Sequence, residues 1–407
     1  MKSIFTASAL LFIQATIDLS AAPTEIVTFD SIPTRVRSQN PELSAARFRI
    51  DEATGRAEQA GRLANPTLDT GISRHTRQNE GSAEIGLTQQ FPLTHRLKLE
   101  KEIGATEIQA AEAEVKNVER LLIAEARSEF VKIVAIRERK ILLTQQQQLA
   151  AELAAFISEK SKQGEVSALD AAQASIASLQ LTAQERLLDT EETTALGKLR
   201  PLLGIEPQTG VTLSGNPSSL DLPKNPDIQR ADLTAAQLQL RASESGIALE
   251  QAKRREDISA SVFAAGERSE DVPGGIGNET LIGFKLSIPL PFWNNNQGRI
   301  DTAVAARNRK EQEIKALTDQ IRHESATAVT EMQQLTTLVT ELEEKLIPLA
   351  REQTGLLEKA YKEGQGDLQH VLNSRQQTLE LLASKIDATR EFHLANIRLL
   401  AALGTGI

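Results

Sequence analysis

Residues able to do chemistry are few in this chain, and they stand apart from one another. There is no cysteine, which excludes disulfides, thiolate metal sites and a cysteine nucleophile. The five histidines show neither the i, i+4 spacing nor the short-motif spacing of zinc ligands; they are His75, His95, His323, His370 and His393. The sequence also pairs no nucleophile with a base and has no glycine-rich phosphate loop. We therefore expect no enzyme, no cofactor and no metal site.

The composition indicates long packed helices. Hydrophobic residues make up 40% of the 407 residues but aromatic residues only 3%, and alanine and leucine are interspersed with glutamine and glutamate. Such a mixture suits coiled coils better than a compact enzyme core. The formal net charge of -9 argues against a nucleic-acid partner, because phosphate binding requires clustered lysine and arginine.

The first residues have the pattern of a cleavable secretory signal. Lys2 is followed by an apolar run over 4–17 and by small residues at 20–22. We interpret 1–22 as a signal peptide, with a short buried helix as the alternative. No later stretch approaches the roughly 18 consecutive apolar residues of a transmembrane helix, so a membrane location would require a β-barrel.

Proline and glycine divide the rest of the chain into two halves with one pattern. Several sequence features recur: Asn40-Pro41 as Asn225-Pro226, Phe91-Pro92-Leu93 as Ile288-Pro289-Leu290, and Leu203-Gly204 as Leu403-Gly404. These matches predict a two-fold internal repeat, with repeats at 23–204 and 226–407 and a linker over 205–225. We interpret extra residues in the second repeat as a longer loop at 267–279.

Each repeat is predicted to run helix, strand, strand, very long helix, turn, long helix. Apolar residues at spacings of three and four, as at Leu122, Ala126 and Phe130, predict packed helices. The predicted long helices span 94–163, 167–203, 297–362 and 367–403. At 1.5 Å per residue, the first would be about 100 Å long, longer than a compact domain.

Four segments have the alternation of β-strands, at about 66–75, 82–92, 257–266 and 279–290. In the last of these, Ile282, Phe284 and Leu286 alternate with glycine or polar residues. Each has the length of a strand that crosses a bilayer in a tilted barrel. Aromatic residues, most of them near predicted strand ends, would form an interfacial girdle: Phe91, Phe263, Phe284, Phe292 and Trp293.

Four strands cannot close a membrane barrel, for which roughly eight is the practical minimum. Open edges in lipid would leave backbone groups unpaired, at a cost of several kcal/mol each. We therefore expect further copies of the chain to complete the wall. Three copies would give twelve strands and twelve helices, although the strand arithmetic alone requires only an oligomer.

Along essentially its whole mature length the chain resembles the TolC family of outer-membrane efflux channels. The Asn-Pro pairs, the paired hairpins and the glycine-containing turns carry this resemblance, and segment 345–376 is similar to the family's second tip, with Pro348, Tyr361, Gly364, Leu372 and Gln376 in the expected places. Segment SIPLPFWNNNQGRI (287–300) resembles the branch that serves cobalt–zinc–cadmium and related heavy-metal efflux systems.

The resemblance implies a mainly α-helical fold with a membrane β-barrel portion. It implies a homotrimer whose 12-stranded β-barrel continues into a periplasmic α-helical barrel, in the outer membrane of a Gram-negative bacterium. It also implies a periplasmic adaptor and an inner-membrane pump of the proton-driven RND type as partners. The chain would then be the passive exit duct of a tripartite system for divalent heavy-metal cations. Two alternatives stay open: a duct for drugs or type I secreted polypeptides, and a periplasmic coiled-coil adaptor.

The turns at 162–167 and 362–367 would be the tips that dock the adaptor. The tip residues are Gly164, Glu165, Ser167, Tyr361, Gly364, Gly366 and Asp367. The glycines allow the chain to reverse, and Ser167 and Asp367 are candidate helix N-caps.

The resemblance places the pore constriction just beyond the tips, at Asp170, Gln173, His370 and Asn373. The family's best-known member has carboxylates at the second pair of positions, where this chain has His370 and Asn373. Three copies of Asp170 would instead supply an anionic ring, and His370 would make opening sensitive to pH. The alternative is that both are ordinary solvated residues near a helix end.

Overall fold

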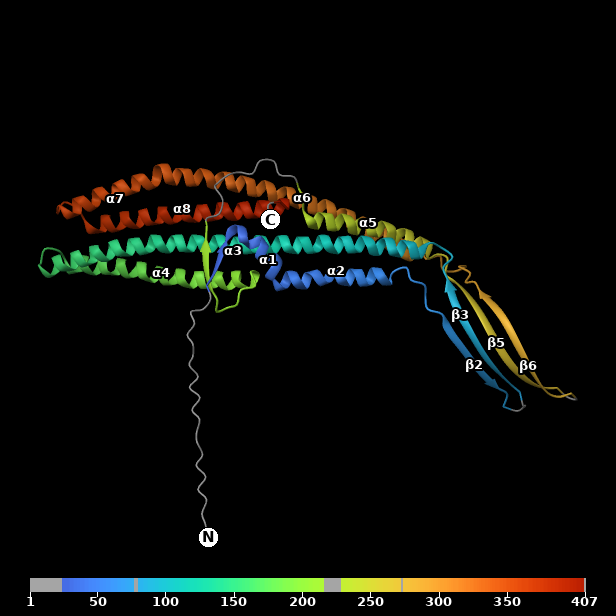
Figure 1. The fold of residues 1–407 in the computed structure, drawn as a ribbon. Helices are drawn as coiled ribbons and strands as arrows, with labels where there is room; N and C mark the ends of the chain where they lie inside the picture. The colour runs from blue at the N-terminus through green and yellow to red at the C-terminus, as the bar shows by residue number, and fades with distance from the viewer. Residues whose placement is uncertain (1–23, 77–79, 216–227, 272–273, 406–407) are drawn as a thin grey trace, which may run out of the picture.

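The chain folds into a long bundle of helices with a four-stranded β-sheet at one end (Figure 1). The computed structural model describes residues 24–76, 80–215, 228–271 and 274–405. The predicted signal peptide at 1–22 and the Asn225-Pro226 pair therefore lie outside the described residues.

A first helical hairpin extends away from the sheet (Figure 1). It consists of α3 (Arg96–Lys162) and α4 (Ala168–Leu202), where the sequence predicts 94–163 and 167–203. With 67 residues, α3 spans about 100 Å and connects the sheet to the far end of the molecule. None of the described helices has the length and apolar character needed to cross a bilayer.

A second helical hairpin lies beside the first. Its outgoing arm consists of α6 (Gln297–Glu341), η2 (Leu342–Leu346) and α7 (Ile347–Lys362), and its return arm is α8 (Leu368–Leu403). The prediction of one continuous α-helix over 297–362 is wrong at η2, which is π-helical: the Ile347 N–H bonds the Leu342 carbonyl. Pro348 explains the wider turn, because proline lacks an N–H and its ring clashes with the carbonyl four residues earlier.

Shorter helices cover the half of the bundle nearer the sheet. They are α1 (Ile32–Gln39), α2 (Pro41–Gln59) and α5 (Ala231–Ala252). Helix α2 packs on α3, and α5 lies between α3 and α6. The helices α4 and α8 end near mid-length, where α2 and α5 begin (Figure 1).

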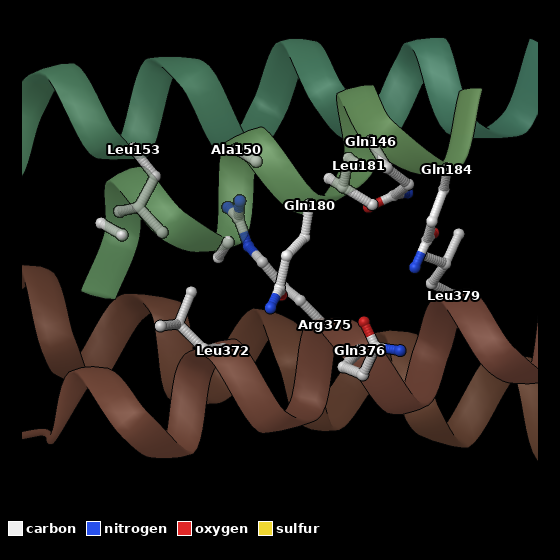
Figure 2. A pocket seen from close by; sticks show the side chains of 12 residues that line it. Gln146, Ala150, Leu153, Gln180, Leu181, Gln184, Leu372, Arg375, Gln376 and Leu379 are labelled. Carbon is white, nitrogen blue, oxygen red and sulfur yellow. The ribbon is translucent and has the colours of Figure 1, made fainter. Parts of the chain in front are cut away.

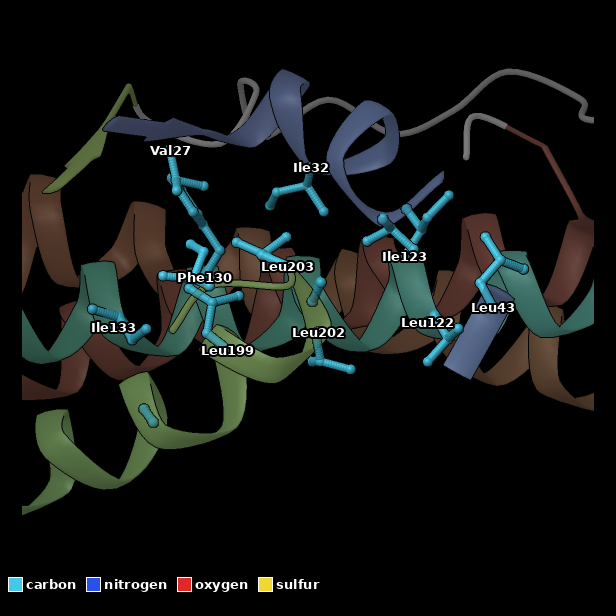
Figure 3. Close-up of a cluster of buried hydrophobic side chains, with 14 of the residues drawn as sticks. Val27, Ile32, Leu43, Leu122, Ile123, Phe130, Ile133, Leu199, Leu202 and Leu203 are labelled. Carbon is cyan, nitrogen blue, oxygen red and sulfur yellow. The ribbon is translucent and has the colours of Figure 1, made fainter. Parts of the chain in front are cut away.

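The largest described hydrophobic core lies at this mid-length position (Figure 3). Ile123 and Phe130 of α3 are fully buried there against Ile32 of α1, Leu43 of α2 and Leu199 of α4. Burying such side chains stabilises the packing by about 1.5–3 kcal/mol each. This core fixes the separate helices onto α3.

A small parallel sheet covers the core, and the sequence did not predict it. Strand β1 (Thr24–Thr28) pairs with β4 (Gly210–Ser214). The predicted linker at 205–225 is therefore structured over its described first part, because β4 gains a partner from a distant segment of the chain. A 3-10 turn, η1 (Phe29–Ser31), follows β1, with Thr28 and Ser31 forming a capping box.

The main sheet is antiparallel, in the order β2 (Thr67–Arg74), β3 (Gly81–Phe91), β5 (Ile258–Asp271) and β6 (Gly275–Ser287). Two predictions are corrected here. The longer loop expected at 267–279 is largely strand, and Arg268 pairs with Asn278, because ladder hydrogen bonds require no apolar side chains. Strand β6 stops at Ser287 instead of 290, because Pro289 has no N–H to donate.

An ion pair ties the sheet to the helices. Arg96, the first residue of α3, donates from Nε to Oδ1 of Asp257 at 2.9 Å, just before β5 begins. Its Nη1 lies 3.1 Å from Oε1 of Glu100 in the next turn. This ion pair therefore joins the start of α3, which follows β3, to the residue that precedes β5.

Candidate functional site

The two hairpin tips are built alike. Gly164 and Gly364 have φ of 76° and 73°, a conformation that reverses the chain and that residues with a Cβ rarely adopt. Ser167 is the N-cap of α4, with Oγ accepting from the Asp170 N–H at 3.1 Å. Asp367 is the N-cap of α8, with Oδ1 accepting from the Gln369 N–H at 3.2 Å. Each tip is thus a glycine turn followed by a capped helix start.

A shared hydrophobic cluster holds the two tips against each other. Ile157 and Ala174 of the first hairpin are buried with Leu368 of the second. Tyr361 packs on this cluster, and its buried hydroxyl has no hydrogen-bond partner in the part of the chain that the structure describes. Burial raises the pKa of Tyr361, and the negative charges of Asp170 and Asp367 raise it further.

The remaining predicted tip residues lie at the surface or close to the backbone. Glu165 is exposed and forms an ion pair with Lys160, with Nζ 2.6 Å from Oε2. A Cβ on Gly366 would lie 2.9 Å from the Tyr361 nitrogen, so glycine allows the backbone to approach closely there. The tips therefore present a polar outer surface over an apolar contact.

The predicted constriction residues fall one to two turns beyond the tips. Asp170 and Gln173 are half-buried on α4, and His370 and Asn373 are exposed on α8. Members of each pair are three residues apart and share a helix face. Nδ1 of His370 lies 3.9 Å from Oδ2 of Asp367, and Asn373 accepts from the Gln369 amide at 2.9 Å. The described ion pairs of His370 thus involve Asp367 and not Asp170.

A cavity of about 70 Å³ with a mixed lining of alanine, leucine and polar side chains lies between the two hairpins, near the tips (Figure 2). Four glutamines line it: Gln146, Gln180, Gln184 and Gln376. Arg375 of α8 enters the same space, where its Nε donates to Oε1 of Glu358 at 2.7 Å and its Nη1 donates to the Leu149 carbonyl of α3 at 3.2 Å. Sequence analysis missed Arg375 because an exposed-looking arginine gives no local sign of a distant carbonyl.

The four-stranded sheet has one apolar and one polar face, because side chains alternate along each strand and the pairing keeps like residues in line. Most residues of the first face are apolar: Leu68, Ile72, Ala83, Ile85, Leu87, Phe91, Ile258, Ala260, Val262, Ala264, Ile282, Phe284 and Leu286. Thr70, Gln89 and Thr280 lie among them, and Arg74, Arg268 and Asn278 lie toward the loop ends of the strands. The second carries Asp69, Ser73, Ser82, Glu84, Thr88, Gln90, Ser259, Ser261, Phe263, Glu267, Lys285 and Ser287. On the first face Ile72 is 88% exposed and Ile282 77%. A continuous apolar surface of this kind requires an apolar partner.

The aromatic residues of the predicted girdle do not all lie on one face of the sheet. Phe91 and Phe284 are on the apolar face, and Phe292 and Trp293 lie beyond the end of β6, in a T-shaped contact with their ring centroids 6.1 Å apart. Phe263, however, lies in the middle of β5 on the polar face, where glycines on both neighbouring strands leave room for it.

Comparison with known proteins decides the family. The model of the outer membrane efflux protein family matches residues 32–205 and 222–405. The chain belongs to this family. The TolC-like resemblance is thereby confirmed, and the chain is an outer-membrane efflux channel component of a family whose members are transport ducts and not enzymes. Channels of this family function as trimers with an adaptor and an inner-membrane pump.

Individual relatives agree with this assignment. The chain is 22% identical over 300 residues to the cobalt-zinc-cadmium resistance protein CzcC of Cupriavidus metallidurans. The aligned region covers 71% of this chain and 69% of that protein. Its fold matches the outer membrane protein VceC of Vibrio cholerae with a TM-score of 0.75 at 18% identity, covering 93% of this chain and 96% of that one. It matches CusC with a TM-score of 0.75 at 17% identity, covering 93% and 92%.

Proposed function

We propose that three copies of this chain form the passive exit duct of a tripartite efflux system for divalent heavy-metal cations. The four strands of each copy contribute to a 12-stranded barrel in the outer membrane of a Gram-negative bacterium, and the helices continue it as a periplasmic tunnel. A proton-driven inner-membrane pump of the RND type supplies the cargo through a periplasmic adaptor.

The two-faced sheet with open edges is the observation that supports this assembly. Among the described residues, strands β2 and β6 each pair with one neighbour, so their outer edges are available to another copy. Lipid requires every backbone group to be paired, and joining β6 of one copy to β2 of the next pairs both edges. The apolar face then meets lipid, and the polar face lines the lumen.

Extraction and mass measurement test the assembly. We expect the mature protein to leave outer-membrane fractions only with detergent and to have the protein mass of three chains. A stable, water-soluble monomer obtained without detergent would refute the barrel, because a single chain leaves its apolar face uncovered.

We assign adaptor docking to the hairpin tips. The support is their position at the end of the molecule farthest from the sheet, with exposed polar residues such as Glu165 and Gln365 around glycine turns (Figure 1). We assign the constriction to the helix starts that follow, where Asp170 of α4 and His370 of α8 succeed the two tips.

The likeness to CzcC and the segment 287–300 support metal ions as cargo. A strain that lacks this chain, challenged with zinc, cobalt, cadmium and copper salts and with a panel of detergents and dyes, tests this cargo class. We expect sensitivity to the metal salts, reversed by the wild-type chain. Sensitivity confined to the organic compounds would instead identify a duct for drugs.

A further inference from the structure

One row of residues crosses all four strands on the polar face of the sheet. Asp69 of β2 pairs with Gly86 of β3, Gly86 pairs with Phe263 of β5, and Phe263 pairs with Gly283 of β6. An aromatic ring on this face is unexpected, because the other strand aromatics, Phe91 and Phe284, lie on the apolar face.

The Phe263 ring lies against the backbone of β6. A Cβ added to Gly283 would lie 2.4 Å from Cζ, 2.6 Å from Cε1 and 3.0 Å from Cε2 of this ring. On the other side, a Cβ on Gly86 would lie 3.1 Å from Cβ of Phe263. The ring thus occupies the volume that a side chain at Gly283 would fill, and Phe263 is half-buried as a result.

Strand side chains usually stand roughly perpendicular to their sheet. A phenylalanine that did so on the polar face would project from the wall. We propose that Gly283 keeps the Phe263 ring flat on the wall and that the duct therefore stays wide at this level. This inference rests on the proposed function, in which the polar face lines the lumen.

The consequence for cargo is that bulky solutes can pass this level of the duct. Three copies bring three Phe263 rings to one level of the barrel and three Asp69 carboxylates to a common level close to it, because the strands of a barrel are tilted. With the rings flat, this level stays wide and its polar groups are the carboxylates. With any larger residue at position 283 the rings must turn away from the wall, and bulky solutes are then excluded before small hydrated ions.

Size-graded labelling tests the inference independently of the tips. The chain has no cysteine, so the Ser259→Cys variant carries one thiol, four residues beyond Phe263 toward the helices on the polar face. Maleimides of increasing size, added to the outside of cells, must pass the Phe263 level to react. The Glu267→Cys variant carries its thiol four residues to the loop side of that level and reports access to the barrel mouth.

We expect Gly283→Ala to shift the labelling cut-off of Ser259→Cys to smaller maleimides and to leave labelling of Glu267→Cys unchanged. Adding Phe263→Ala to Gly283→Ala should restore the cut-off. Gly266→Ala is the matched control, because it lies on the opposite face and its Cβ would meet nothing within 4 Å. An unchanged cut-off in Gly283→Ala, or a shift that persists in the double variant, would overturn the inference.

If Gly283→Ala does not assemble, the Phe263→Ala variant by itself tests whether the ring lies flat on the wall. A ring that already lies flat leaves the cut-off nearly unchanged when it is removed, whereas a large shift to bigger maleimides would show that the ring stands in the lumen. Failure of the proposed duct looks different, because Ser259→Cys in the otherwise wild-type chain would then resist even the smallest maleimide.

Discussion

Asn40 joins the start of α2 to the end of α4, which are 162 residues apart in the chain. Its Nδ2 donates to the Leu202 carbonyl at 2.9 Å, and its Oδ1 accepts from the Leu43 N–H at 2.8 Å. The side chain is therefore an N-cap and a tertiary contact at once, and only 3% of the residue is exposed. It fixes the point where the helices meet beside the mid-length core.

Asn40→Ala should destabilise the protein more than loss of a surface cap does. A lost N-cap costs about 1 kcal/mol, and a buried carbonyl left without a partner adds about 1–3 kcal/mol. Ser167→Ala, at an exposed cap, should cost about 1 kcal/mol and serves as the control. Thermal unfolding followed by circular dichroism measures both; equal losses would contradict the tertiary role of Asn40.

Acid should weaken the contact between α5 and its neighbours through Asp232. Burial alone would raise the pKa of Asp232, but hydrogen bonds from Arg230 and the charges of Arg230 and Arg120 hold it below its usual range. A carboxyl with a lowered folded-state pKa stabilises the fold above its unfolded pKa of about 4 and loses this effect as pH falls.

Asp232→Asn should therefore lower the unfolding temperature at pH 7, and its deficit relative to wild type should shrink as the pH falls below about 4. Asp319→Asn, in an exposed pair with Arg322 at 3.4 Å, should change little at any pH. A deficit of Asp232→Asn that is the same at pH 3 and pH 7 would refute the linkage.

Tyr361→Phe should not destabilise the isolated protein. The buried hydroxyl has no hydrogen-bond partner among the described residues, so its removal relieves a desolvation cost of about 1–3 kcal/mol. Tyr361→Ala should destabilise the tips, because it removes the ring from the shared cluster. A lower melting temperature in Tyr361→Phe would show that the hydroxyl has a partner in the assembled channel.

Asp170→Ala/His370→Ala should pass more current than wild type in a planar bilayer and be less selective for cations, because an anionic ring both narrows and charges a constriction. Glu165→Ala, on the tip turn, should leave conductance unchanged and controls for general loosening of the tips. Wild-type conductance and selectivity in the double variant would defeat the assignment of these residues to the constriction.

The ends of the long helices at the tips could be predicted from the sequence because local residues determine them. Gly164, Gly364 and the capping residues fix the tips locally, so the helix ends there lie within two residues of the predicted ones. The alternation in β3 and β6 is visible because one face is apolar and the other polar, which a single segment reveals without its partner.

Features that depend on distant partners were missed. Strands β1 and β4 are short, and each is a strand only because the other pairs with it. The extended ends of β5 and β6 are rich in glycine and charged residues, so they look like a loop until their register is known. The contact between Arg375 and the Leu149 carbonyl likewise depends on the fold, because it joins residues 226 positions apart in the chain.

The open edges of β2 and β6 make the unassembled chain prone to aggregation through strand pairing. In water, each is a row of unpaired N–H and C=O groups beside an apolar surface, the combination that drives strands of different molecules to add to one another indefinitely. The geometry that lets three copies close a ring would equally let many copies grow into a ribbon. In the proposed channel, the strand edges of one copy must therefore be kept from pairing with those of other copies until the sheet reaches lipid.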